Sequence, residues 1–259
     1  MAANITGSVL VTGSNRGIGL ELVRQLCEST CPPSQIFAGC RDPNGPKGEA
    51  LKALAQKHQH LVTIVELDTT KQASITAAAK VVGSKLKDRS LNLLINNAAV
   101  NIPGSLTETG EQQMMDVFHT NTVGPLLMIK EFLPFLRTAA AQSGAQCDMS
   151  SQRSAVVNVS TLISSIEKCP ETFLHAPMYP YRVSKAALNM LTRCLSEDLK
   201  KDGILVMALH PGWVQTDMGG PEAPLSTVDS VIGMVKVIAT LSEKHLGTLV
   251  DWEGNRIPW

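Results

Sequence analysis

Tyr181 and Lys185 are the two residues whose types and spacing most clearly suggest chemistry. They lie four positions apart in a segment with helical periodicity, so both side chains belong to one face of the predicted helix. A phenol with its reference pKa of about 10 transfers protons poorly at neutral pH, whereas a neighbouring ammonium favours the phenolate and lowers that pKa. The pair therefore predicts acid–base chemistry, although a YxxxK spacing also arises by chance on helices without a catalytic role.

A glycine-rich turn near the N-terminus suggests where a charged ligand binds. It follows the apolar run at residues 8–11 and precedes a segment with helical spacing at residues 17–29. Glycine lets the backbone turn tightly and approach a pyrophosphate, whose charge is favoured by the amides that begin the helix. The strand–turn–helix context predicts a dinucleotide phosphate site, although many such turns bind nothing. The predicted contacts are Gly13, Asn15, Arg16, Gly17, Ile18 and Gly19.

The residues after the second predicted strand indicate which dinucleotide binds. A fold that prefers NAD places a carboxylate there for the ribose 2′-hydroxyl, whereas this chain has Cys40 and Arg41. Arg41, together with Arg16, has the geometry to pair with a 2′-phosphate, which favours NADP(H). Asp42 precedes Pro43, so we expect it to form a turn. The alternative is that both arginines are solvated surface residues.

The elements that position these residues alternate along the chain. Seven short, almost continuously apolar runs are expected to be strands, at residues 8–11, 36–39, 61–67, 91–95, 155–159, 204–209 and 248–251. Segments with helical spacing lie between them, at residues 17–29, 48–57, 72–87, 111–137, 184–200 and 226–243. Continuously apolar strands are typical of a parallel sheet covered on both faces. The pattern predicts a doubly wound α/β fold, a seven-stranded parallel sheet between two helical layers, with residues 139–153 as an irregular link.

Composition excludes several functional classes. The 23 basic and 23 acidic residues balance, so we expect neither nucleic acid nor a membrane surface as a partner. No apolar run approaches the roughly 18 residues that a membrane span requires. The six cysteines form no metal-ligand or disulfide pattern, which predicts no metal site and a cytoplasmic protein. We expect a single domain over residues 1–259, acting on a small molecule.

Taken together, these motifs closely resemble the short-chain dehydrogenase/reductase family, over the whole chain. The shared pattern is TGxxxGxG at residues 12–19, a central NNA segment at residues 96–98, a helical Asn121, a hydroxyl residue and YxxxK. Within the family, the runs at residues 179–185 and 210–220 are most similar to the carbonyl reductases. The resemblance implies a Rossmann fold, NADPH or NADP⁺ as cofactor, and a carbonyl substrate.

The resemblance also implies a role for each matching residue. Tyr181 would protonate the carbonyl oxygen, Lys185 would tune it and bind the nicotinamide ribose, and Asn121 would hold a water in the proton relay. A structural amide is the alternative for Asn121. Further cofactor contacts implied by position are Asp68, Thr69, Asn97, Ala98, Pro211, Gly212, Val214 and Thr216.

Three departures from the family pattern affect these expectations. Thr161 aligns with the usual catalytic serine, so its hydroxyl is expected to orient the carbonyl, with Ser164 or Ser165 as alternatives. Ala99 replaces the usual glycine beside the cofactor. The step from Thr161 to Tyr181 is longer than usual, which implies an insertion at residues 167–180 that shapes substrate access.

The sequence leaves other points open. The leading interpretation is NADPH-dependent reduction of an aldehyde, ketone or quinone, in a pocket made apolar by Trp213 and Met218. A catalytically weak NADPH-binding regulatory or partner-binding protein is the alternative. A sugar-nucleotide epimerase would need a longer C-terminal region and normally NAD. The physiological carbonyl and the choice between monomer and homodimer are not determined.

Overall fold

The computed structural model describes residues 4–87, 90–144 and 148–259. Eight strands form one sheet in the order β3-β2-β1-β4-β5-β6-β7-β8. The strands are β1 (Ser8–Thr12), β2 (Gln35–Cys40), β3 (Val62–Glu66), β4 (Leu93–Asn96), β5 (Ala155–Val159), β6 (Leu205–His210), β7 (Leu249–Asp251) and β8 (Arg256–Ile257). The first seven pair in parallel, which confirms the predicted doubly wound sheet.

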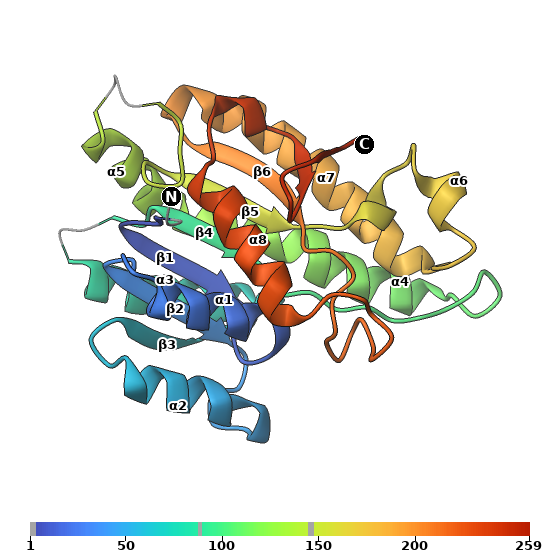
Figure 1. Cartoon of the computed structure of the whole chain (residues 1–259), viewed down its shortest axis with the longest axis horizontal. Coiled ribbons are helices and arrows are strands. Elements are labelled where there is room, and N and C mark those ends of the chain that lie inside the picture. The colour runs from blue at the N-terminus through green and yellow to red at the C-terminus, as the bar shows by residue number, and fades with distance from the viewer. Residues whose placement is uncertain (1–3, 88–89, 145–147) are drawn as a thin grey trace.

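Helices cover both faces of this sheet (Figure 1). One face carries α1 (Gly17–Glu28), α2 (Glu49–Lys57) and α8 (Thr227–Ala239), and the other carries α3 (Gln72–Leu86), α5 (Gly124–Gln142) and α7 (Tyr179–Leu199). A shorter helix, α4 (Glu111–Phe118), contacts α7, and α6 (Cys169–Thr172) lies in the connection between β5 and α7. The layers match the predicted three-layer fold.

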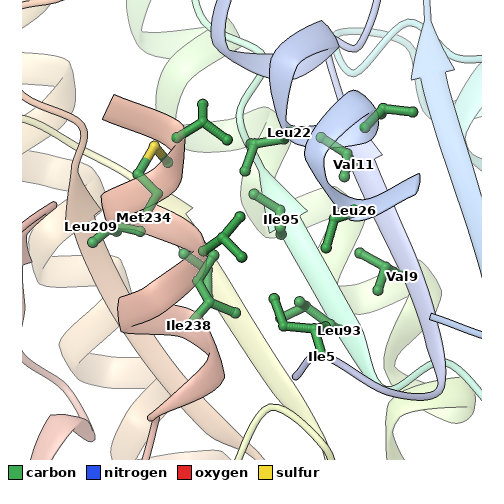
Figure 2. Packing of buried hydrophobic residues seen from close by; sticks show 14 of the residues in the cluster. Ile5, Val9, Val11, Leu22, Leu26, Leu93, Ile95, Leu209, Met234 and Ile238 are labelled. Atoms are coloured by element: carbon green, nitrogen blue, oxygen red, sulfur yellow. The ribbon is translucent and has the colours of Figure 1, made fainter. Parts of the chain in front are cut away.

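The core lies between the sheet and the two helical layers. On the α1 and α8 face, Leu22 and Leu26 from α1 meet Met234 and Ile238 from α8 over strand residues such as Ile95 (Figure 2). Each of these side chains is at most 2% exposed. Burying one aliphatic side chain contributes roughly 1.5–3 kcal/mol. The strands are mostly apolar and packed by helices on both faces. This packing fixes the positions of the strand ends at one edge of the sheet.

The structure differs from the sequence-based expectation in several elements. β8 pairs antiparallel with β7, and its two residues are too few for a pattern to reveal them. The predicted helix at residues 111–137 is divided by a π-helical turn, His119–Val123, and continues to Gln142. The predicted link at residues 139–153 therefore begins four residues too early, and part of it, with Cys147, lies outside the described residues. The helix predicted to begin at Ser184 begins at Tyr179, where Pro180 fits the first turn.

Candidate functional site

A cleft of about 940 Å³ lies at the ends of the parallel strands. The segments that follow β1, β2, β3, β4, β5 and β6 all contribute to its wall. In an open α/β sheet, ligands bind outside the carboxyl ends of the strands, and this volume suits a cofactor with a substrate. Every cofactor-contact residue expected from the sequence lines this cleft, as do Thr161, Trp213 and Met218.

The glycine turn after β1 is held in shape by main-chain geometry and by Asn97. Gly13 and Gly17 have positive φ angles of 68° and 53°, and a Cβ atom on Gly19 would lie 2.1 Å from the carbonyl oxygen of Gly13. The Asn97 side chain donates to the carbonyl oxygens of Thr12 and Gly13 at 2.9 and 3.2 Å. No side chain caps the first turn of α1, and that turn contains no acidic residue. The amides at this helix end can therefore receive an anion.

The cleft has a basic region beside this turn. Arg16, Arg41 and Lys47 line it, and Arg16 and Lys47 both contact one carboxylate oxygen of Asp217, at 2.6 and 3.4 Å. These hydrogen bonds and charges lower the pKa of the Asp217 carboxyl, the bond from Lys47 contributing most. Sequence reasoning missed Lys47 and Asp217. The lysine could have been noticed in the loop that carries Arg41, whereas Asp217 is 201 positions from Arg16.

Two carboxylates near the basic region have partners of their own. Asp42 accepts hydrogen bonds from the amides of Asn44 and Gly45 at 3.1 and 2.8 Å, which confirms its predicted turn. Asp68 accepts from the amide and hydroxyl of Thr70 at 3.0 and 2.7 Å. Asp68 and Thr69 both line the cleft, so the end of β3 contributes polar groups to its wall.

Tyr181 and Lys185 lie in the first turns of α7 and face the other end of the cleft. The Lys185 ammonium nitrogen is 5.9 Å from the centre of the Tyr181 ring. Burial raises the pKa of Tyr181 to about 12, and burial lowers the pKa of Lys185 to about 7. The expected lowering of the Tyr181 pKa by Lys185 is therefore wrong in direction, because desolvation of both groups dominates. At neutral pH the phenol carries its proton.

The hydroxyl groups after β5 have different surroundings. Within the described part of the chain, neither the Thr161 hydroxyl nor the Tyr181 hydroxyl has a hydrogen-bond partner, and both residues line the cleft. Ser164, by contrast, accepts from Asn189 at 2.8 Å and donates to the carbonyl oxygen of Thr161 at 2.5 Å. Neither Ser164 nor Ser165 lines the cleft. Of Thr161, Ser164 and Ser165, only Thr161 lines the cleft.

Asn121 lies in the π-helical turn rather than at the cleft wall. It is fully buried, and its amide nitrogen donates to the carbonyl oxygen of Val100 and the hydroxyl of Ser184, at 2.8 and 3.0 Å. Its side-chain oxygen accepts from the amide of Val100 at 2.9 Å. Both N–H groups are used, so the side chain joins the segment after β4 to α7.

His210, at the end of β6, also lines the cleft. Burial lowers its pKa to about 4, against the opposing charge of Asp251, so the imidazole is neutral at pH 7.

The arrangement joins the glycine turn, a basic region and the two unpartnered hydroxyls of Thr161 and Tyr181 in one cleft. The family model for short chain dehydrogenases matches residues 7–224. The chain belongs to the short-chain dehydrogenase family. In the described part of the chain, no helix is long and apolar enough to cross a membrane. The same residues contain no group of three or more His, Cys, Asp or Glu side chains that could hold a metal ion.

Several solved carbonyl reductases are similar to this chain. The NADPH-bound carbonyl reductase from chicken fatty liver is 44% identical, with a TM-score of 0.92 over 97% of this chain and 98% of that one. Carbonyl reductase Sniffer of D. melanogaster is 36% identical, with a TM-score of 0.91 over 97% and 99% of the two chains. A short-chain dehydrogenase of Penicillium roqueforti (strain FM164) is 30% identical over 263 residues, 99% of this chain and 98% of the relative.

Proposed function

We propose that this protein is an NADPH-dependent carbonyl reductase that acts on aldehydes, ketones or quinones. The observation that carries the proposal is the pair of unpartnered hydroxyls, Tyr181 and Thr161, on the wall of the cleft that begins at the phosphate turn. A carbonyl oxygen that gains electron density needs a proton donor and a hydrogen-bond donor. Two free hydroxyls at one site supply both.

The residues at the other end of the cleft fit NADPH. The uncapped start of α1 and the closely packed glycines suit a pyrophosphate, and Arg16, Arg41 and Lys47 suit a 2′-phosphate. Similarity to the NADPH-bound reductase from chicken fatty liver supports the same choice. When bound, NADPH supplies the hydride that reduces the carbonyl carbon.

Tyr181 and Thr161 act on the carbonyl oxygen. The Tyr181 hydroxyl gives its proton to that oxygen, and burial, which raises the pKa of Tyr181 to about 12, keeps the phenol protonated at neutral pH until that transfer. The Thr161 hydroxyl donates a hydrogen bond that orients the carbonyl. Lys185 lies beside the tyrosine ring, and its contact with the Val159 carbonyl fixes its ammonium at 2.7 Å from that oxygen.

Asn121 is a positioning residue in this proposal. Its amide holds the chain beside Val100 against Ser184 on α7, one residue before Lys185. The family resemblance also implies that Asn121 holds a water in the proton relay, and this role stays a prediction. We also propose that the protein is cytoplasmic and that it forms a single domain. The single continuous sheet supports the single domain.

A cofactor-oxidation assay tests the proposal. The purified protein is mixed with NADPH and with a panel of quinones, diketones and aromatic aldehydes, and the absorbance of the reduced cofactor is followed. We expect saturable oxidation of NADPH with at least one class of carbonyl, and formation of the matching alcohol or hydroquinone. Tight NADPH binding with no turnover across the panel would instead favour the regulatory alternative.

A further inference from the structure

Arg182, the neighbour of Tyr181 on α7, is buried beneath the insertion that precedes the helix. Only 7% of the residue is exposed. Its guanidinium donates to the carbonyl oxygens of Ala176, Ile163 and Thr172 at 2.7, 3.0 and 2.7 Å. A further bond of 3.1 Å reaches the Thr172 hydroxyl. Four hydrogen bonds therefore join one side chain of the helix to residues 163–176.

All of these acceptors are neutral. Among the described residues, no ion pair includes Arg182. Its other close neighbours are the Cys169 sulfur, 4.0 Å from a guanidinium nitrogen, and the Phe173 ring, whose centre is 5.6 Å from the guanidinium carbon. A buried charge is unfavourable unless hydrogen bonds satisfy it. The folded backbone of the insertion supplies those bonds, so the burial of Arg182 and the conformation of the insertion depend on each other.

The residues that Arg182 binds are also part of the cleft wall. Ile163, Thr172 and Ala176 line the cleft on the side of Tyr181, together with Met178. The insertion has little packing of its own, because α6 has four residues and Leu174 is 87% exposed. Other contacts also hold this wall: the Glu167 amide donates to the Trp259 carbonyl oxygen at 3.0 Å, the Asn101 side-chain amide donates to the Met178 sulfur at 3.3 Å, and the Phe173 ring contacts Tyr179 edge-on. The guanidinium supplies the larger number of hydrogen bonds.

We propose that Arg182 is a positioning residue that holds residues 166–178 as the substrate-side wall of the cleft, and thereby sets the affinity for bulky carbonyl substrates. This inference rests on the proposed function. An arginine suits the role because its planar fork reaches several carbonyl oxygens at once, whereas a lysine offers one compact ammonium. The charge alone would not hold the wall.

The test compares Arg182→Met and Arg182→Lys with a matched control. Arg193→Met removes an exposed arginine of the same helix, which pairs only with Glu197 among the described ion pairs. Chymotrypsin cleavage after Phe173 and Leu174 measures release of the insertion, with the sites identified by mass spectrometry. Steady-state kinetics with a bulky quinone and NADPH titration by fluorescence measure the consequence for each ligand.

Both Arg182 variants are expected to be cleaved about tenfold faster in the insertion and to show a KM for the quinone about tenfold higher. Their kcat should stay within about threefold of the wild-type value, because the lost interactions act equally on substrate and transition state. NADPH affinity should not change, and Arg193→Met should match the wild type in every readout.

Three results would overturn the inference. The first is continued protection of the insertion from chymotrypsin in both Arg182 variants, and the second is an unchanged KM despite faster cleavage. The third is failure of both variants to fold, because Arg182 would then stabilise the whole fold and not the cleft wall alone. A wild-type protein without turnover would instead refute the proposed function, and the cleavage data would still report whether Arg182 holds the insertion.

Discussion

Lys185 donates a buried hydrogen bond of 2.7 Å from its ammonium to the main-chain carbonyl of Val159. This contact ties the start of α7 to the end of β5 and fixes the lysine beside Tyr181. Only 2% of Lys185 is exposed, and burial lowers its pKa to about 7. The lysine that the proposed reaction needs is therefore held at a cost to the stability of the fold.

The stability of the protein without cofactor should depend on pH through Lys185. Between about pH 7 and the unfolded lysine pKa of about 10.4, the unfolded chain binds a proton that the folded chain has lost, so stability rises with pH. The free energy of unfolding of the wild type should rise relative to Lys185→Met by at most about 1.4 kcal/mol per pH unit. Urea unfolding from pH 6 to 10 measures this difference. Lys201→Met, which removes an exposed lysine, should show the same pH dependence of the free energy of unfolding as the wild type. If the free energies of unfolding of wild type and Lys185→Met change in parallel with pH, the prediction is refuted.

The basic region should determine the preference for NADPH over NADH. Arg41→Asp should lower the affinity for NADPH relative to NADH by at least about tenfold, because a charged contact to the 2′-phosphate becomes repulsive. Lys47→Asp should act in the same direction. Lys52→Asp is the matched control, since Lys52 pairs with Glu49 and does not line the cleft. Equal losses for both cofactors would contradict a phosphate role.

The Thr161 hydroxyl should be needed for turnover. Removing a hydrogen-bond donor to a developing oxyanion costs about 10²–10³ in kcat, so Thr161→Ala should lose that much whereas Thr161→Ser keeps most of the activity. Ser164→Ala is the informative comparison, because that hydroxyl binds Asn189 away from the cleft and its loss should leave kcat nearly unchanged. A larger kcat defect for Ser164→Ala than for Thr161→Ala would transfer the role to the serine.

The glycine turn should tolerate no side chain at residue 19. A methyl group there would meet the carbonyl oxygen of Gly13 at 2.1 Å, within backbone that cannot easily move. Gly19→Ala should therefore weaken NADPH binding by at least about tenfold, or lower Tm if the turn deforms. Gly110→Ala, whose Cβ would make only an ordinary contact with the Gln113 side chain at 4.0 Å, should leave NADPH binding unchanged. Unaltered binding by Gly19→Ala would show that the turn does not form the phosphate site.

Patterns local in sequence predicted much of the fold and site. The seven parallel strands were visible because most of their residues are apolar, in almost continuous runs. The Tyr181–Lys185 pair was visible because one helical turn separates the two residues. Cleft-lining residues after successive strands followed from the doubly wound topology, which brings those strand ends to one edge.

Long-range contacts and short elements could not be predicted in the same way. β8 has two residues, the π-helical turn interrupts a continuous helical pattern, and α6 lacks any periodicity. The Arg16–Asp217 ion pair and the bonds from Arg182 to the insertion depend on tertiary packing that no spacing encodes. The pKa of Tyr181 was predicted in the wrong direction because its neighbour was visible in the sequence and its burial was not.

The most direct test of the central claim is a comparison of wild type and Tyr181→Phe under single-turnover conditions with NADPH and a carbonyl from the panel. The account predicts the loss of about 10²–10⁴ in rate that is typical for a missing general acid, with NADPH affinity unchanged. Tyr179→Phe, which retains the aromatic contact with Phe173, should keep wild-type activity. Turnover by Tyr181→Phe at the wild-type rate would contradict the assignment of Tyr181 as the proton donor.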